Sequence, residues 1–176
     1  MPRDLLFDHA NARFSYRISA LIVQGGRALL QCPVGTSDYA FIGGHVAFGE
    51  TAKDTLRREI REELHADAVI GELCAVGEVF IDWGRCVDGT PRHCHQIGLY
   101  FRATVDEGQL PRAERFFGYD EAGGEKYSIE YIWVPLEKLS TLTVYPPEVA
   151  AHLRQGAQEV LHFEYTELAP DTAWPE

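Results

Sequence analysis

Glutamates gather between residues 59 and 63 of the sequence, at Glu59, Glu62 and Glu63. Apolar residues recur every four positions through the same segment, which predicts an amphipathic helix over residues 51–64. At about 100° per residue, Glu63 falls inside the edge of the apolar stripe and Glu59 lies beside it. Carboxylates crowded at such a boundary repel one another and lose hydration, so we expect a cation to compensate them. A hard divalent ion that takes oxygen ligands, Mg²⁺ or Mn²⁺, suits that role.

The residues just before this helix form a loop suited to an ion or a phosphate. Gly43-Gly44 and Gly49 allow backbone shapes that bring carbonyls or amides close to a ligand, and Glu50 closes the loop. Arg58 can neutralise part of the acidic charge. The competing interpretation is a solvated acidic helix with ion pairs four residues apart, which leaves the glycine loop unexplained.

Together these residues resemble the Nudix box of the Nudix hydrolase family, in the pattern Gly44-x5-Glu50-x7-Arg58-Glu59-Ile60-x-Glu62-Glu63. Seven defined positions over about twenty residues make this a specific motif. There are departures at Ile42, where the family often has proline, and at His65 and Ala66, where it has glycine and a bulkier aliphatic residue. Histidine tolerates the left-handed conformation that glycine adopts at a helix end better than most residues do.

The resemblance implies a function and a set of roles. The protein would be a pyrophosphohydrolase that splits a P–O–P bond in a small nucleoside diphosphate-X compound by attack of a metal-activated water. The implied ligands of Mg²⁺ or Mn²⁺ are Glu59, Glu62 and Glu63, with the Gly43 carbonyl. Arg58 would orient the glutamates and Glu50 would brace the loop. Glu62, Glu63 or a carboxylate from a loop would act as general base.

Other side chains are weaker candidates. The family often adds a loop glutamate, for which Glu121, Glu125 and Glu130 are available; Glu125 is preferred as a further metal ligand. Substrate contacts are expected from Arg17 and Phe14 on the first long strand and from Gly44. Further aromatic candidates for stacking on a base are Trp83, Phe116 and Phe117. The group Cys86, His93, Cys94 and His95 lacks the spacing of a zinc site.

The remaining pattern predicts an α+β fold, the Nudix-type mixed β-sheet sandwiched between α-helices, as one domain over residues 1–176. Residues 14–24 and 27–32 read as a hairpin around Gly25-Gly26. Further strands are expected at residues 75–83, 96–105 and 131–135, and a final helix is expected at residues 148–155. Residues 118–126 are expected to be an acidic loop, and residues 168–176 a weakly ordered tail.

The net charge and composition of the chain limit the classes of partner that it is expected to bind. The 16 Lys+Arg against 27 Asp+Glu give a formal net charge of −11, which argues against binding nucleic acid. No apolar run suits a membrane span or a signal peptide, so the cytoplasm is the expected location. No G-x-S-x-G or Walker loop is present. A homodimer is expected only by analogy, and the alternative function is a catalytically silent Nudix domain that binds nucleotide as a sensor or interaction module.

Overall fold

The computed structural model describes residues 3–122 and 125–175, with the side chains of residues 120–125 left aside. The strands are β1 (Leu6–His9), β2 (Ala12–Gln24), β3 (Arg27–Pro33), β4 (Asp38–Ala40), β5 (Ala68–Arg85), β6 (Pro91–Val105), β7 (Arg115–Ala122), β8 (Glu125–Pro135), β9 (Thr143–Tyr145) and β10 (Leu161–Thr166). The helices are α1 (Ala52–Leu64), α2 (Pro147–Gln155) and the short 3₁₀ helix η1 (Leu136–Thr141).

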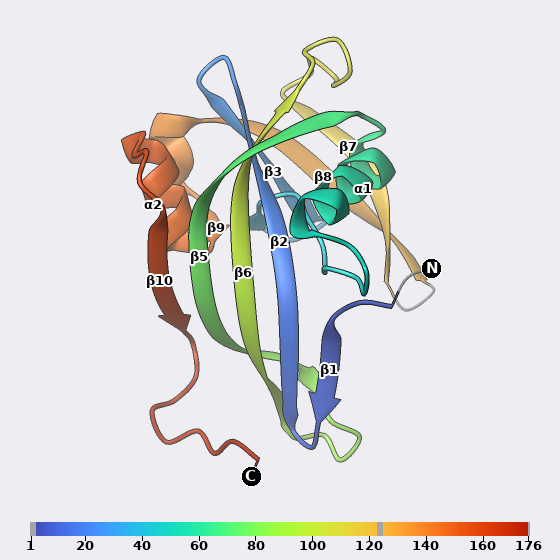
Figure 1. Cartoon of the computed structure of the whole chain (residues 1–176), viewed down its shortest axis with the longest axis vertical. Helices are drawn as coiled ribbons and strands as arrows, with labels where there is room; N and C mark the ends of the chain where they lie inside the picture. The colour runs from blue at the N-terminus through green and yellow to red at the C-terminus, as the bar shows by residue number, and fades with distance from the viewer. Residues whose placement is uncertain (1–2, 123–124, 176) are drawn as a thin grey trace.

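The strands form one mixed sheet whose order is β10-β5-β6-β2-β3-β4-β9. β1 pairs with β2, and the β7–β8 hairpin pairs with β3 through β8. The long strands β2 and β6 run parallel, whereas β5 and β6 run antiparallel. α1 and α2 lie on opposite sides of the sheet (Figure 1), so the expected arrangement of a mixed sheet between helices is confirmed. Among the described residues, neither helix is long and apolar enough to cross a membrane.

Strand β2 has buried side chains on both faces because it lies in the middle of these layers. Ile18, Ala20 and Ile22 point into the core that also contains Leu56 and Ile60 of α1. Leu21 points into the second core, on the α2 side. This alternation follows from the two-residue repeat of a strand. Arg17 and Ser19 therefore share the α2-side face with Leu21.

Helix α1 has the bounds that its sequence pattern predicts. The Thr51 hydroxyl accepts a hydrogen bond from the Asp54 backbone N–H at 3.2 Å and caps the first turn. Leu56, Ile60 and Leu64 are buried, as the four-residue repeat requires. The helix ends at His65, whose φ of 53° and ψ of 35° are left-handed. His65 thus occupies the conformation that glycine would favour at this position.

Several strands differ from the sequence-based expectation. The acidic loop predicted at residues 118–126 is wrong: this segment contributes to β7 and β8, which pair antiparallel from Arg115↔Ile132 to Ala122↔Glu125. Glycine and charged residues disfavour a strand locally, but pairing with β8, itself held by β3, overrides that preference. The strands β1, β4, β9 and β10, of three to six residues each, were not expected from the sequence.

Replacing the residue that ends α1 tests the left-handed cap. We expect His65→Gly to raise the free energy of unfolding by about 0.5–1 kcal/mol, because glycine adopts φ near 53° without a Cβ clash. His65→Ala serves as the matched variant and should not be more stable than the wild type, since it keeps the Cβ. Urea unfolding followed by circular dichroism measures both. Equal stability of the Gly and Ala variants would contradict this account of the cap.

Candidate functional site

The backbone of residues 42–46 runs along β2 as an additional short strand. The Ala20 N–H donates to the Ile42 carbonyl at 2.7 Å, and the Ile18 N–H donates to the Gly44 carbonyl at 2.9 Å. Farther along, the Val46 N–H donates to the Tyr16 carbonyl at 3.0 Å. These bonds fix the glycine loop against the sheet, so its position does not depend on its own side chains.

Both glycines of this segment stand where a side chain would not fit. A Cβ at Gly43, whose φ is 157°, would lie 2.1 Å from the carbonyl oxygen of Ile18. A Cβ at Gly44 would lie 2.5 Å from the carboxyl carbon of Glu59. The Glu59 carboxylate therefore packs directly on the Gly44 backbone, and α1 approaches the sheet at that point.

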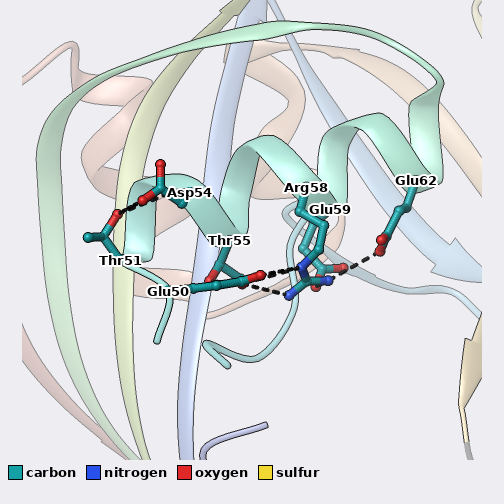
Figure 2. Close-up of polar contacts among 7 residues, drawn as sticks. All are labelled: Glu50, Thr51, Asp54, Thr55, Arg58, Glu59 and Glu62. Atoms are coloured by element: carbon teal, nitrogen blue, oxygen red, sulfur yellow. Dashed lines mark hydrogen bonds and ion pairs between the residues drawn. The ribbon is translucent and has the colours of Figure 1, made fainter. Parts of the chain in front are cut away.

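Arg58 connects the acidic side chains of the site (Figure 2). Its Nε donates to Glu50 at 3.1 Å, and its Nη1 donates to Glu59 at 2.7 Å and to Glu62 at 3.2 Å. The Thr55 hydroxyl donates to Glu50 at 2.8 Å. The Arg58 hydrogen bond is the main reason that the pKa of Glu50 lies below its ordinary value. Burial alone would lower the pKa of Arg58, but its bonds to Glu50 and its attraction to Glu59 outweigh burial and raise it.

The carboxylates of α1 differ in exposure, which separates what each can do. The Glu62 side chain is 61% exposed and that of Glu59 is 14% exposed. Glu63 is buried, and the Tyr131 hydroxyl donates to its Oε2 at 3.5 Å. The position of Glu63 at the edge of the apolar stripe is thus as the helix geometry predicts. Of the three, Glu62 is the one most exposed to bulk solvent.

The donor set at this site fits a hard divalent cation. It consists of carboxylate oxygens and backbone carbonyls, the ligands that Mg²⁺ and Mn²⁺ prefer. In this structure Arg58 supplies the positive charge between Glu59 and Glu62. Within the described ranges, no three acidic, histidine or cysteine side chains stand close enough to form a ready-made metal cluster.

A cavity of about 400 Å³ opens on the other face of the sheet, beside the same glycine segment. Its walls come from β2, β4, β5, β6, the β9–α2 junction and β10. The Arg17 guanidinium lies at its boundary and donates to the Gly43 carbonyl at 3.4 Å. The Glu59 carboxylate therefore lies against Gly44, and the Arg17 guanidinium lies against the Gly43 carbonyl.

Trp83, which lines the cavity, belongs to a stack of three side chains. The Trp83 ring lies parallel to the His45 ring, with centroids 5.4 Å apart and planes at 11°, and the Arg13 guanidinium lies 4.9 Å from the Trp83 ring centroid. The His45 Nε2 atom is buried without a hydrogen-bond partner. Burial, helped by the positive charges of Arg17 and Arg13, lowers the pKa of His45 to about 4. His45 is therefore neutral at pH 7, which suits an aromatic wall.

The structure brings some of the predicted substrate residues together and separates others. Arg17 and Trp83 both line the cavity, whereas Gly44 lies against the Glu59 carboxylate. Phe14 does not share the cavity with Arg17, because it points to the opposite face of β2 and contacts Phe7 at 6.5 Å between ring centroids. Residues three apart in a strand face opposite sides of the sheet, so Phe14 and Arg17 cannot both contact a substrate on one face of β2. The remaining aromatic candidates divide: Phe116 packs on Tyr131, and Phe117 is exposed.

The candidate loop glutamates also differ in their surroundings. Glu130 lies on β8, where the Arg115 Nη1 donates to its Oε1 at 2.6 Å, so it belongs to a separate ion pair. Glu125 is the first residue of β8 rather than a loop residue, and its side chain, like that of Glu121, lies outside the described residues. The expectation that Glu121 or Glu125 provides a further metal ligand therefore stays a prediction.

Sequence reasoning missed side chains that the fold brings in from distant segments. Burial raises the pKa of Asp4, which lies close enough to Arg58 and Glu50 for their charges to act on it. The cavity adds several more polar and aromatic residues: Asp38, Gln96, Tyr100, Tyr145, Tyr165 and Glu167. The sequence does not indicate that these residues share a cavity, because they come from β4, β6, β9, β10 and the chain just after β10.

Comparisons with known proteins show the family and the fold of the chain. The family model described as the NUDIX domain matches residues 14–155. Among solved structures, a MutT protein from Bacillus halodurans has a TM-score of 0.60 at 18% identity, covering 87% of this chain and 91% of its own. An ADP-ribose pyrophosphatase from Streptococcus suis has a TM-score of 0.55 at 13% identity, with 86% and 98% covered. A UDP-X diphosphatase has a TM-score of 0.53 at 16% identity, with 84% and 66% covered.

The lowered pKa of His45 predicts a pH dependence of stability. Between about pH 6.5 and pH 4 the unfolded chain binds a proton at residue 45 and the folded chain does not, so stability is lost as the pH falls through this window. We expect a loss on the order of 2 kcal/mol, since each pKa unit corresponds to about 1.4 kcal/mol and His45 is only partly exposed.

The variant His45→Phe keeps the stack on Trp83 but does not titrate, so its unfolding free energy should fall less over this pH range. Urea unfolding at a series of pH values measures the slope. His9→Phe, at an exposed histidine, is the matched control and should retain the wild-type slope. Identical slopes for the wild type and His45→Phe would show that His45 does not cause the effect.

Proposed function

The chain belongs to the NUDIX domain family and is a hydrolase, and we propose that it splits a P–O–P bond in a nucleoside diphosphate-X compound with the help of a divalent metal ion. The observation that carries the proposal is the packing of the Glu59 carboxylate on Gly44, next to the bond between Arg17 and Gly43. This arrangement sets an acidic, metal-binding face and a cavity of nucleotide size on the two sides of one backbone segment.

The proposed metal ligands are Glu59, Glu62 and Glu63, with the Gly43 carbonyl. A bound Mg²⁺ or Mn²⁺ would neutralise phosphate oxygens and lower the pKa of a coordinated water. Arg58 positions Glu59 and Glu62 through the bonds of its Nη1. Glu50 holds Arg58 in turn and is itself fixed by Thr55, so it acts as a positioning residue.

Glu62 is the proposed general base. Its exposure lets a carboxylate oxygen meet the attacking water, while Glu63 is enclosed beside Tyr131. The carboxylate takes a proton as the water oxygen forms its bond to phosphorus, and the bond from phosphorus to the bridging oxygen breaks. The leaving group departs with the bridging oxygen. Rate enhancement comes mainly from position and charge, because the reacting phosphates are anionic.

The cavity is the proposed site of the nucleoside. Arg17 faces it from the side of the glycine segment, where a guanidinium can donate two hydrogen bonds to one phosphate. The aromatic walls, Trp83 among them, offer flat surfaces for a base. In a protein with a formal net charge of −11, a local arginine and a metal ion are what make an anionic substrate acceptable.

Removing the carboxylates of α1 tests the chemistry. We expect the double variant Glu62→Gln/Glu63→Gln to lose turnover by about 100-fold or more, because it loses proposed ligands and the proposed base. Phosphate or monophosphate release is measured on nucleoside di- and triphosphates, nucleotide sugars and dinucleotides, with Mg²⁺ or Mn²⁺ and again with a chelator. Glu72→Gln, at an exposed glutamate on β5, is the control and should retain turnover.

Two results of that assay would contradict the proposal. Unchanged turnover in the double variant would exclude these glutamates from the mechanism, and full activity in the chelator would exclude the metal. If no substrate is turned over but a nucleotide raises the melting temperature, the chain is a binding module instead.

Substituting Gly44 tests the contact with Glu59 separately. We expect Gly44→Ala to reduce turnover at least about tenfold, because the new Cβ displaces the Glu59 carboxylate. The melting temperature should change little, since only the end of one side chain has to move. Gly108→Ala, where a Cβ meets nothing within 4 Å, is the matched control. Wild-type turnover in Gly44→Ala would show that the position of Glu59 does not matter for the reaction.

A further inference from the structure

The cavity beside Arg17 has charges of opposite sign on its two sides. Arg17 lies on β2, whereas Glu167 follows β10, and both line the cavity. β6 and β5 stand between these strands. Three strand spacings of about 4.8 Å separate β2 from β10, or about 14 Å. A substrate that crosses the cavity with its phosphate at Arg17 therefore places its other end near a carboxylate.

A second carboxylate lies on the wall that meets β10. Asp38 begins β4, which pairs with β9 through Ala40 and Tyr145. The Tyr145 ring contacts the Tyr165 ring of β10 edge-on, with centroids 6.2 Å apart. This contact joins the β4–β9 wall to β10, so Asp38 and Glu167 both belong to walls that meet there.

Gln96 is a buried amide side chain that lines the cavity. The buried Ser15 hydroxyl donates to the Gln96 Oε1 at 3.4 Å, which occupies the amide carbonyl. On the β10 side, the Tyr165 hydroxyl donates to the Glu167 Oε1 at 2.5 Å and holds that carboxylate in place. The cavity thus combines hydrogen-bond acceptors at its acidic walls with a donor from Gln96.

From this arrangement we infer that the cavity selects nucleobases that carry an exocyclic amino group, namely guanine, adenine and cytosine, over uracil and thymine. Asp38 and Glu167 accept hydrogen bonds from the amino group, and the Gln96 amide donates to a ring nitrogen or carbonyl of the base. Guanine fits best, because its adjacent ring N–H and amino N–H can bind one carboxylate together. Uracil and thymine offer one ring N–H that is flanked by two carbonyl oxygens, and those oxygens would be repelled by the carboxylates. The inference rests on the proposed function in taking a nucleotide as the substrate.

Binding of mononucleotides tests the inference without requiring turnover. Isothermal titration calorimetry of the full chain with GMP, AMP, CMP and UMP should give a dissociation constant for GMP about tenfold or more below that for UMP. In the double variant Asp38→Asn/Glu167→Gln the preference should shrink to about twofold or less, because the amides also donate. Arg17→Gln should weaken all four nucleotides alike and leave their ratios unchanged.

Matched variants keep this experiment independent of folding. Glu164→Gln lies on the same strand as Tyr165, at an exposed position outside the cavity lining, and should retain the wild-type ratios. The single variants Asp38→Asn and Glu167→Gln replace exposed side chains with ones of equal size, so each is assayed alone if the double variant does not fold.

The outcomes separate this inference from the proposed function. Equal affinity for GMP and UMP, no binding of any mononucleotide, or an unchanged preference in the Asp38 and Glu167 variants would overturn the inference. Metal-dependent turnover could still be observed in each of those cases. Conversely, selective binding of GMP without metal-dependent turnover of any nucleotide would support the cavity assignment and overturn the proposed hydrolysis.

Discussion

The close approach of α1 to the sheet at Gly44 is the constraint on which the site depends. The segment 42–46 is hydrogen-bonded along β2, so its backbone has little freedom to retreat from the helix. Because Gly44 has no Cβ, the Glu59 carboxylate occupies the space that a side chain would fill. Because Gly43 has none either, the same segment lies against the Ile18 carbonyl. A larger residue at Gly44 would displace the Glu59 carboxylate, and one at Gly43 would push the segment away from the β2 backbone.

Electrostatics explains why Arg58 is central to this arrangement. A chain with a formal net charge of −11 concentrates four glutamates around one helix and loop, and their mutual repulsion requires a fixed cation. Arg58 forms ion pairs with three of them, Glu50, Glu59 and Glu62. Its planar guanidinium group can bind several carboxylates at once. Glu63 is buried, and the Tyr131 hydroxyl donates to its carboxylate. The site therefore holds carboxylates in two environments, one exposed to solvent and one nearly dry.

The part of the fold that could be predicted from sequence is the part with local signals. Thr51 and Asp54 mark the start of α1, and the spacing of Leu56, Ile60 and Leu64 defines its buried face. The β2–β3 hairpin follows from Gly25-Gly26 between apolar runs. By contrast, residues 118–126 were expected to form a loop, because the pairing that makes them strands comes from β8 and β3 and not from their own composition. The two-residue repeat of a strand by itself places Arg17 and Phe14, three residues apart on β2, on opposite faces of the sheet.

By itself the sequence determined the family, the acidic helix and the glycine loop, because helix periodicity, capping and motif spacing are properties of residues close together in the chain. It determined Arg58, Glu59 and Glu62 as neighbours for the same reason. Only the tertiary structure decided that Tyr131 reaches Glu63, that His45 stacks on Trp83, and that Asp38, Gln96 and Glu167 share a cavity with Arg17. These residues lie on separate strands, and strand order and register, set by long-range hydrogen bonds and burial, bring them together.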